Sequence, residues 1–120
     1  MTEWLQFVPK GEFSRFAVGA QNDAMAMGAR NALATPPVAR SHPSMSRIPV
    51  IGCDGTPDYG RRLVTAGKLS ATVIMPPTAG RAVHEIASTL GGKASPPAEI
   101  LLTPSSFPEL TRGGRLPKGT

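Results

Sequence analysis

The sequence predicts an α/β protein with an incomplete, doubly wound parallel sheet. Three short apolar runs, at residues 16–20, 48–53 and 69–75, each end at polar or Pro-rich residues and are followed by a stretch with helical features. Strands that alternate with helices of about ten residues are typical of a parallel sheet with right-handed crossovers. A fourth apolar stretch at residues 99–103 predicts a last strand.

The first predicted strand leads into the triplet Gln21-Asn22-Asp23 and an Ala- and Met-rich helix that ends near Leu33. We predict Asp23 as the N-cap of this helix, because its carboxylate can accept from the free N–H groups of the first turn. Residues 35–47 contain three prolines, which interrupt regular hydrogen bonding. This stretch is therefore predicted to be a mobile loop.

The second predicted strand ends at Asp54-Gly55-Thr56-Pro57. Thr56 is the predicted cap of a helix whose first residue is Pro57, because the N–H that proline lacks is not needed at that position. Gly67 is expected to close the helix in the left-handed conformation.

The third predicted strand stops at Pro76-Pro77 and is followed by a helix over residues 78–90. Apolar residues recur at the spacing of one helical face, with Thr78 as the cap and Gly91-Gly92 at the end. This is the strongest helix in the chain.

Length and composition limit the possible classes of protein. The chain has 120 residues, 13 Gly, 13 Pro and a net charge of +5, so we expect one modest domain, or a piece of a larger protein, with many turns. Cys53 is the single cysteine and cannot form an intramolecular disulfide. Residues 1–16 are predicted to be an extension without a secretory signal, and residues 104–120 a disordered tail. No segment approaches the length of a membrane span.

In open parallel sheets, ligands bind at the edge formed by the carboxyl ends of the strands. Candidate binding residues follow three of the predicted strands. Asn22 with Asp23, Asp54, and Met75 with Pro76 all fall at this edge. An Asn offers a donor and acceptor, and an ionised Asp accepts from two neighbouring hydroxyls, so the pair suits a polyol such as a sugar. The alternatives are structural: Asp23 as a helix cap and Asp54 as a support for the turn.

Three blocks in order resemble a known family. The segment AQNDAMAMGA at residues 20–29 is similar to the AQND-x-MA-x-GA segment of periplasmic sugar-binding proteins of the ribose-binding type, the solute receptors of ABC transporters. The segments VIGCDGTP at residues 50–57 and GKLSATV at residues 67–73 resemble two further blocks of that family. The resemblance extends over residues 17–103 and implies part of the second lobe of a type 1 periplasmic-binding fold.

The resemblance also implies roles for single residues. Asn22 and Asp54 stand where the family hydrogen-bonds sugar hydroxyls, and Met75 stands at a third contact that is usually a polar Gln. Cys53 occupies an aromatic position of the family, and we predict only a small buried residue there. No cofactor is implied.

Members of that family have two lobes, which implies a hinge crossover near residues 75–77. The helix at residues 78–90 would then pack on the other lobe. In the chain alone its apolar face would be uncovered and open to self-association. The intact protein would be periplasmic and work with a membrane permease, whereas the chain as written, without a signal, would be cytoplasmic. We expect the chain alone to bind sugars weakly or not at all, because one wall of a cleft excludes little water.

Other classes of protein are less well supported. His84-Glu85 begins like a zinc-protease motif, but Ser88 stands where the second His is required, and neither His84 nor His42 has a second ligand at metal-site spacing. We therefore predict neither an enzyme nor a metal site. The effector domain of a sugar-responsive transcriptional repressor is an alternative binding module, since it shares the fold and a similar block at Asn22-Asp23. Nucleic-acid binding is not expected, because the basic residues are scattered and no recognised motif is present.

Overall fold

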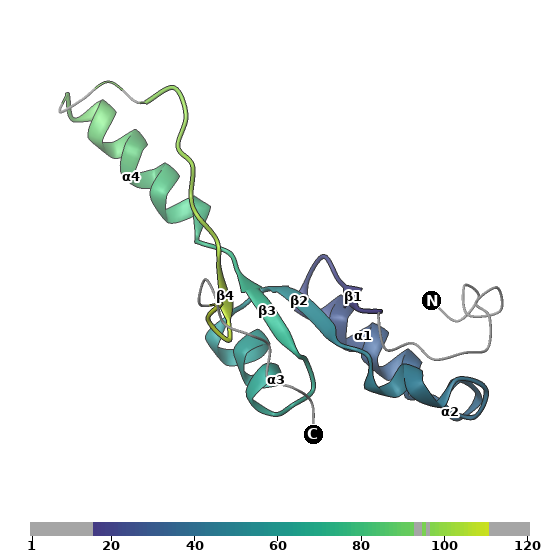
Figure 1. Ribbon diagram of the computed structural model, residues 1–120. Helices are drawn as coiled ribbons and strands as arrows, with labels where there is room; N and C mark the ends of the chain where they lie inside the picture. The colour runs from purple at the N-terminus through teal and green to yellow at the C-terminus, as the bar shows by residue number, and fades with distance from the viewer. Residues whose placement is uncertain (1–15, 93–94, 96, 111–120) are drawn as a thin grey trace.

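A computed structural model describes residues 16–92, 95 and 97–110. Its centre is a sheet of four strands in the order β1 (Val18–Gly19), β2 (Val50–Asp54), β3 (Ala71–Ile74) and β4 (Ser105–Phe107) (Figure 1). The first three strands are parallel neighbours, whereas β4 is antiparallel to β3. The predicted α/β class is confirmed, but the sheet is mixed at its last strand.

The fourth strand lies later in the chain than predicted. Residues 99–103 contain no strand, and β4 pairs through Thr72 opposite Phe107 and Ile74 opposite Ser105. The apolar run was a misleading signal because pairing with β3, which the pattern cannot show, selects the strand. The prediction of a disordered tail from residue 104 is therefore wrong for this strand, while residues 111–120 and 1–15 lie outside the described residues.

Helices fill the chain between β1 and β2. Helix α1 (Asp23–Leu33) is followed by α2 (Pro36–Ser41) and the 3-10 helix η2 (Pro43–Arg47), so the predicted loop at residues 35–47 is wrong. Each of these two short helices has proline in its first turn, where a missing N–H costs no hydrogen bond. The buried side chains of Val38 and Met45 hold them to the core.

The hydrophobic core lies between α1, the two short helices and the sheet. Its largest fully buried apolar side chains are Leu33, Met45 and Val50. The other members are Ala26, Val38, Ile48 and Leu69. This core holds α1 against β2 and so fixes the position of the turn between β1 and α1.

The connection from β2 to β3 is the π-helical turn η3 (Pro57–Arg61), which continues into α3 (Arg62–Thr65). Thr56 is at the N-cap position, but its side chain forms no cap: its carbonyl accepts from the N–H groups of Tyr59 and Arg61 at 3.3 and 3.1 Å. Gly67 has φ of +67°, which confirms the predicted left-handed closure.

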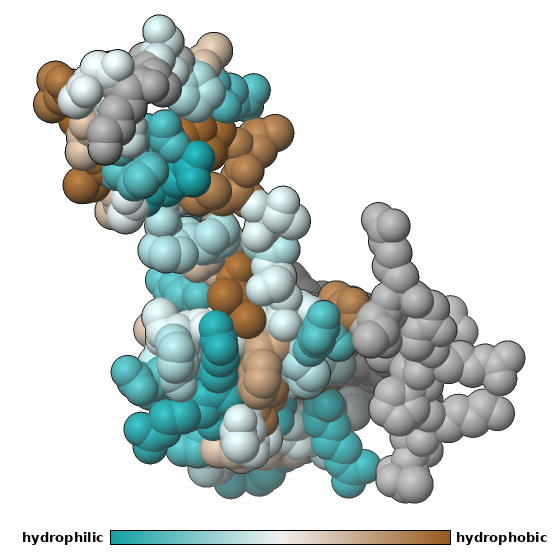
Figure 2. Space-filling view, turned by 90° about the vertical axis from the view of Figure 1, so that its left-hand side faces the viewer, coloured by the Kyte–Doolittle hydropathy of each residue, from teal (hydrophilic) through white to brown (hydrophobic). Residues whose placement is uncertain are grey.

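Helix α4 (Thr78–Leu90) has the predicted bounds, although Pro77 and not Thr78 occupies the N-cap position. It projects from the sheet together with the segment that returns to β4 (Figure 1). No residue of α4 is buried, and Val83, Ile86 and Leu90 are 66, 60 and 83% exposed. Hydrophobic surface gathers on this projecting part (Figure 2). The apolar face is uncovered, as the resemblance implied. Within the described residues no helix has the length and apolarity to cross a membrane.

Candidate functional site

The predicted site residues lie at the carboxyl ends of the three parallel strands. Asn22 follows β1, Asp54 is the last residue of β2, and Met75 comes directly after β3. Asp54 is paired with Ile74, and the N–H of Met75 donates to the carbonyl of Asp54 at 3.2 Å. The structure therefore brings Asp54 and Met75 next to each other at one edge of the sheet.

Asn22 caps helix α1. Its Oδ1 accepts from the backbone N–H of Met25 at 2.7 Å, so the prediction that Asp23 is the N-cap is wrong. An Asn side chain also has two N–H donors. Capping through Oδ1 fixes the side chain, and the two amide N–H groups can still donate to a ligand hydroxyl.

Asp23 is buried beneath the same edge, with an exposed fraction of 1%. Its Oδ1 accepts from the hydroxyl of Thr72 on β3 at 2.6 Å, and its Oδ2 accepts from the N–H of Gly55 at 3.0 Å. The carboxylate thus joins the start of α1 to β3 and to the turn after β2. Sequence reasoning missed this role, because both partners are distant in the chain.

Two glycines leave room for the Asp23 carboxylate. A Cβ atom built on Gly52 or on Gly60 would collide with one of its oxygens. The structure therefore requires glycine at both positions as long as Asp23 is in place. Their spacing around Asp54 is the only sequence signal of the buried carboxylate that we identify.

The turn after β2 has an unusual backbone. Asp54 has φ of +100° and Gly55 has φ of +61°. Positive φ is uncommon for a residue with a side chain, and such conformations persist where the surroundings enforce them, often at binding sites. The Nε of Arg61 donates to the carbonyl of Gly55 at 3.0 Å, which adds a further restraint on the turn. The side chain of Asp54 is exposed.

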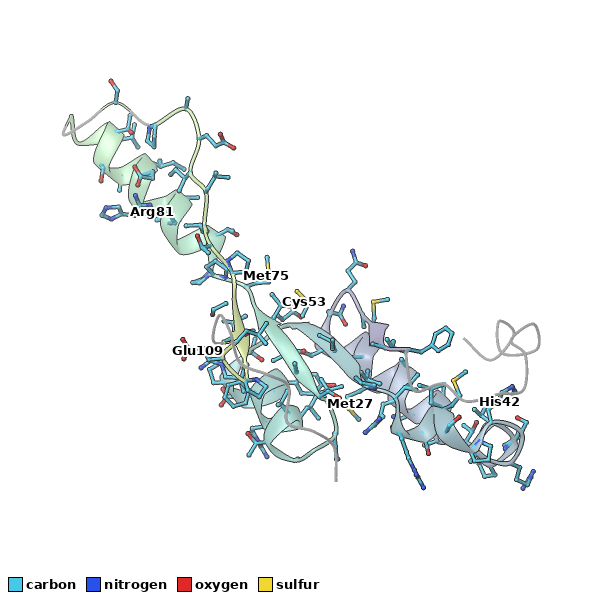
Figure 3. All side chains as sticks on the ribbon, viewed as in Figure 1. Met27, His42, Cys53, Met75, Arg81 and Glu109 are labelled. Atoms are coloured by element: carbon cyan, nitrogen blue, oxygen red, sulfur yellow. The ribbon has the colours of Figure 1, made fainter. Side chains whose placement is uncertain are left out.

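Met75 is 49% exposed and lines a cavity of about 350 Å³ at the junction of β3 with α4. The wall is mostly apolar and includes Pro76, Ile100 and Leu101, with Arg81 at its side. Cys53 is partly buried on β2 near this end of the sheet (Figure 3). Among the described residues, no three His, Cys, Asp or Glu side chains cluster as metal ligands would.

The α/β sheet resembles a defined class, the periplasmic sugar-binding proteins, to which this chain is similar in sequence and in structure. The chain is 48% identical over 61 residues to the ribose import binding protein RbsB of Escherichia coli, and equally so to that of Salmonella typhimurium. Each match covers 51% of this chain and 18% of the relative. No family model matches the chain.

A solved structure supports the same class. The fructose binding periplasmic domain of a hybrid two component system superposes with a TM-score of 0.66 at 25% identity. The match covers 87% of this chain and 32% of that domain's chain. The present chain therefore spans less than a third of the length of each of these proteins.

Proposed function

We propose that this chain is part of a non-catalytic sugar receptor, in which Asn22 and Asp54 bind ligand hydroxyls and Met75 makes an apolar contact. The observation that carries the proposal is the conformation of Asp54. Its backbone has a positive φ, and its side chain is exposed at the carboxyl edge of the sheet. Backbone strain of this kind has a cost of about 1–3 kcal/mol and is typical of functional positions.

The chemistry of the edge suits a monosaccharide. A carboxylate accepts hydrogen bonds from two adjacent hydroxyls, while Asn22 adds N–H donors. Met75 and the apolar cavity beside it match the C–H face of a sugar ring better than a charged ligand. The names of the relatives, which refer to ribose and fructose, support a sugar of this size.

The relatives also guide the proposal for location and partners. One is named for import and the other is a periplasmic domain, so we assign the intact protein to the periplasm with a membrane permease of an ABC transporter as its partner. The import in the name of the ribose-binding relative supports a transport receptor over the effector domain of a repressor. The uncovered face of α4 is the candidate surface for self-association.

The experiment is a titration of the ¹⁵N-labelled chain with D-ribose and with D-fructose, followed by NMR. An exposed edge with a few hydrogen bonds supports a Kd of about 1 mM or weaker, equivalent to at most about −4 kcal/mol. We expect saturable shifts at the backbone of Asp54 and Gly55 and at the side chain of Asn22. The titration is extended to about 100 mM sugar so that such a weak site is detected.

The critical variant is Asp54→Asn, because Asn tolerates positive φ and preserves the turn. Replacing the charged acceptor by a neutral one removes about 1.4 kcal/mol, so we expect about tenfold weaker binding. Asp58→Asn changes another exposed carboxylate four residues further on and is expected to bind as the unchanged chain does. Saturable shifts that lie away from Asp54, Gly55 and Asn22, or that are equal in both variants, would contradict the proposal.

A further inference from the structure

We infer that Asp23 is a positioning residue for sugar binding: it never contacts the ligand, but holds Asp54 in the conformation that presents its carboxylate. The inference rests on the proposed function of the edge. It differs from that function because it concerns a buried residue that no ligand can reach, with an exposed fraction of 1%.

The first step concerns the peptide group between Asp54 and Gly55, which is held at both ends. Its N–H, on Gly55, donates to Oδ2 of Asp23 at 3.0 Å. Its carbonyl, on Asp54, accepts from the N–H of Met75 at 3.2 Å. Because a peptide group is planar, these two hydrogen bonds fix its orientation and, with it, the ψ angle of Asp54.

The second step concerns what fixes the carboxylate itself. The hydroxyl of Thr72 donates to Oδ1 of Asp23 at 2.6 Å, and Thr72 is fully buried in the middle of the sheet. Gly52 and Gly60 pack closely around the same carboxylate, and neither has room for a Cβ. Asp23 therefore has little freedom to move, and the turn that it holds inherits this rigidity.

The third step concerns the backbone strain that the Asp23 carboxylate maintains at Asp54. Asp54 has φ of +100°, a conformation that a residue with a side chain leaves when nothing enforces it. Loss of the Asp23 carboxylate should let the turn relax to ordinary backbone angles. The Asp54 carboxylate would then no longer be presented in the same direction at the carboxyl edge of the sheet.

The test compares Asp23→Ala with Asp23→Asn. Two backbone readouts report on the turn: the three-bond coupling between N–H and Hα of Asp54, which depends on φ, and the chemical shift of the Gly55 N–H. The third readout is the Kd for D-ribose. Asp23→Ala is expected to change both backbone readouts and to weaken binding at least tenfold. Asp23→Asn keeps an acceptor for Gly55 and should retain the turn and bind within about threefold.

Asp58→Ala is the matched control, since it removes an exposed carboxylate and should change none of the three readouts. If Asp23→Ala fails to fold, Thr72→Val removes the partner of the carboxylate on β3 and Thr72→Ser restores it. Thr72→Val is then expected to change the Gly55 N–H and to weaken binding, and Thr72→Ser to recover both.

The result that would overturn the inference is an unchanged Asp54 coupling and Gly55 N–H in Asp23→Ala, or in Thr72→Val where the first variant does not fold. An altered turn with unaltered sugar affinity would also overturn it. A failure of the proposed function is recognised separately, because the sugar-induced shifts of the unchanged chain would then lie away from Asp54 and Asn22.

Discussion

Gly60→Ala tests the packing around Asp23 most directly. Glycine in a helical segment is less favourable than alanine by about 0.5–1 kcal/mol, so propensity alone predicts that the substitution stabilises the protein. The structure predicts the opposite. A Cβ on Gly60 would collide with Oδ2 of Asp23 and would lie 2.7 Å from its Cγ and 3.1 Å from the Cα of Gly55.

The magnitude follows from what must move. The Asp23 side chain is short, buried and held by two hydrogen bonds, so it cannot swing aside as a long surface side chain would. Overpacking costs about 1–3 kcal/mol, and a displaced hydrogen bond to a charged group costs about 1.5–3 kcal/mol. After subtracting the propensity gain we expect a net loss of about 1.5–5.5 kcal/mol in the free energy of unfolding.

Thermal and urea unfolding followed by circular dichroism measure this loss. At about 4 °C per kcal/mol for a chain of this size, Tm should fall by about 6–22 °C. Gly28→Ala is the matched control in α1, because a Cβ there meets nothing within 4 Å. This control should raise Tm by about 2–4 °C.

The double variant of Gly60→Ala with Asp23→Ala isolates the collision. Removing the carboxylate makes room for the new Cβ. The loss of stability in the double variant should therefore be smaller than the sum of the losses in the two single variants. The reasoning is refuted if Gly60→Ala is as stable as the unchanged chain while Gly28→Ala gains stability, or if the losses in the double variant are additive.

Two further predictions concern the core and the projecting helix. Leu33→Ala should lower the free energy of unfolding by about 2–5 kcal/mol, because Leu33 is 1% exposed, whereas Leu110→Ala at an 81% exposed side chain should change it by less than about 0.5 kcal/mol in the same urea titration. Ile86→Lys should reduce concentration-dependent association in sedimentation velocity and lower the fluorescence of a bound hydrophobic dye, since Ile86 is 60% exposed on the apolar face of α4. His84→Lys adds the same charge on the other side of the helix and should leave both signals unchanged; equal effects of the two substitutions would contradict this role of the face.

The sequence predicted correctly those elements whose determinants lie within a few residues of one another. Helix α4 has the expected bounds because its apolar spacing and its flanking Pro77 and Gly91 are all local. The closure at Gly67 was predictable for the same reason. The short helices at residues 36–47 were missed because proline was treated only as a breaker, although it is favoured in the first turn.

The candidate site was predictable in outline but not in mechanism. Parallel strand order alone indicates that residues after β2 and β3 share an edge, and the structure does place Asp54 beside Met75. That Asn22 caps the helix while Asp23 is a buried acceptor could not be predicted. A cap and a buried acceptor look alike in sequence, and the partners of Asp23 are 32 and 49 residues away.

The absence of buried residues in α4 has a consequence for local unfolding. An isolated helix of 13 residues is marginal in water, because few hydrogen bonds offset the cost of nucleation. Helix α1 is held by Ala26 and Leu33 in the core, so its amide hydrogens exchange only when much of the sheet opens. The amides of α4 can exchange through fraying alone. The protein thus combines a cooperative unit around β1 to β3 with a helix that gains its stability from whatever covers its apolar face.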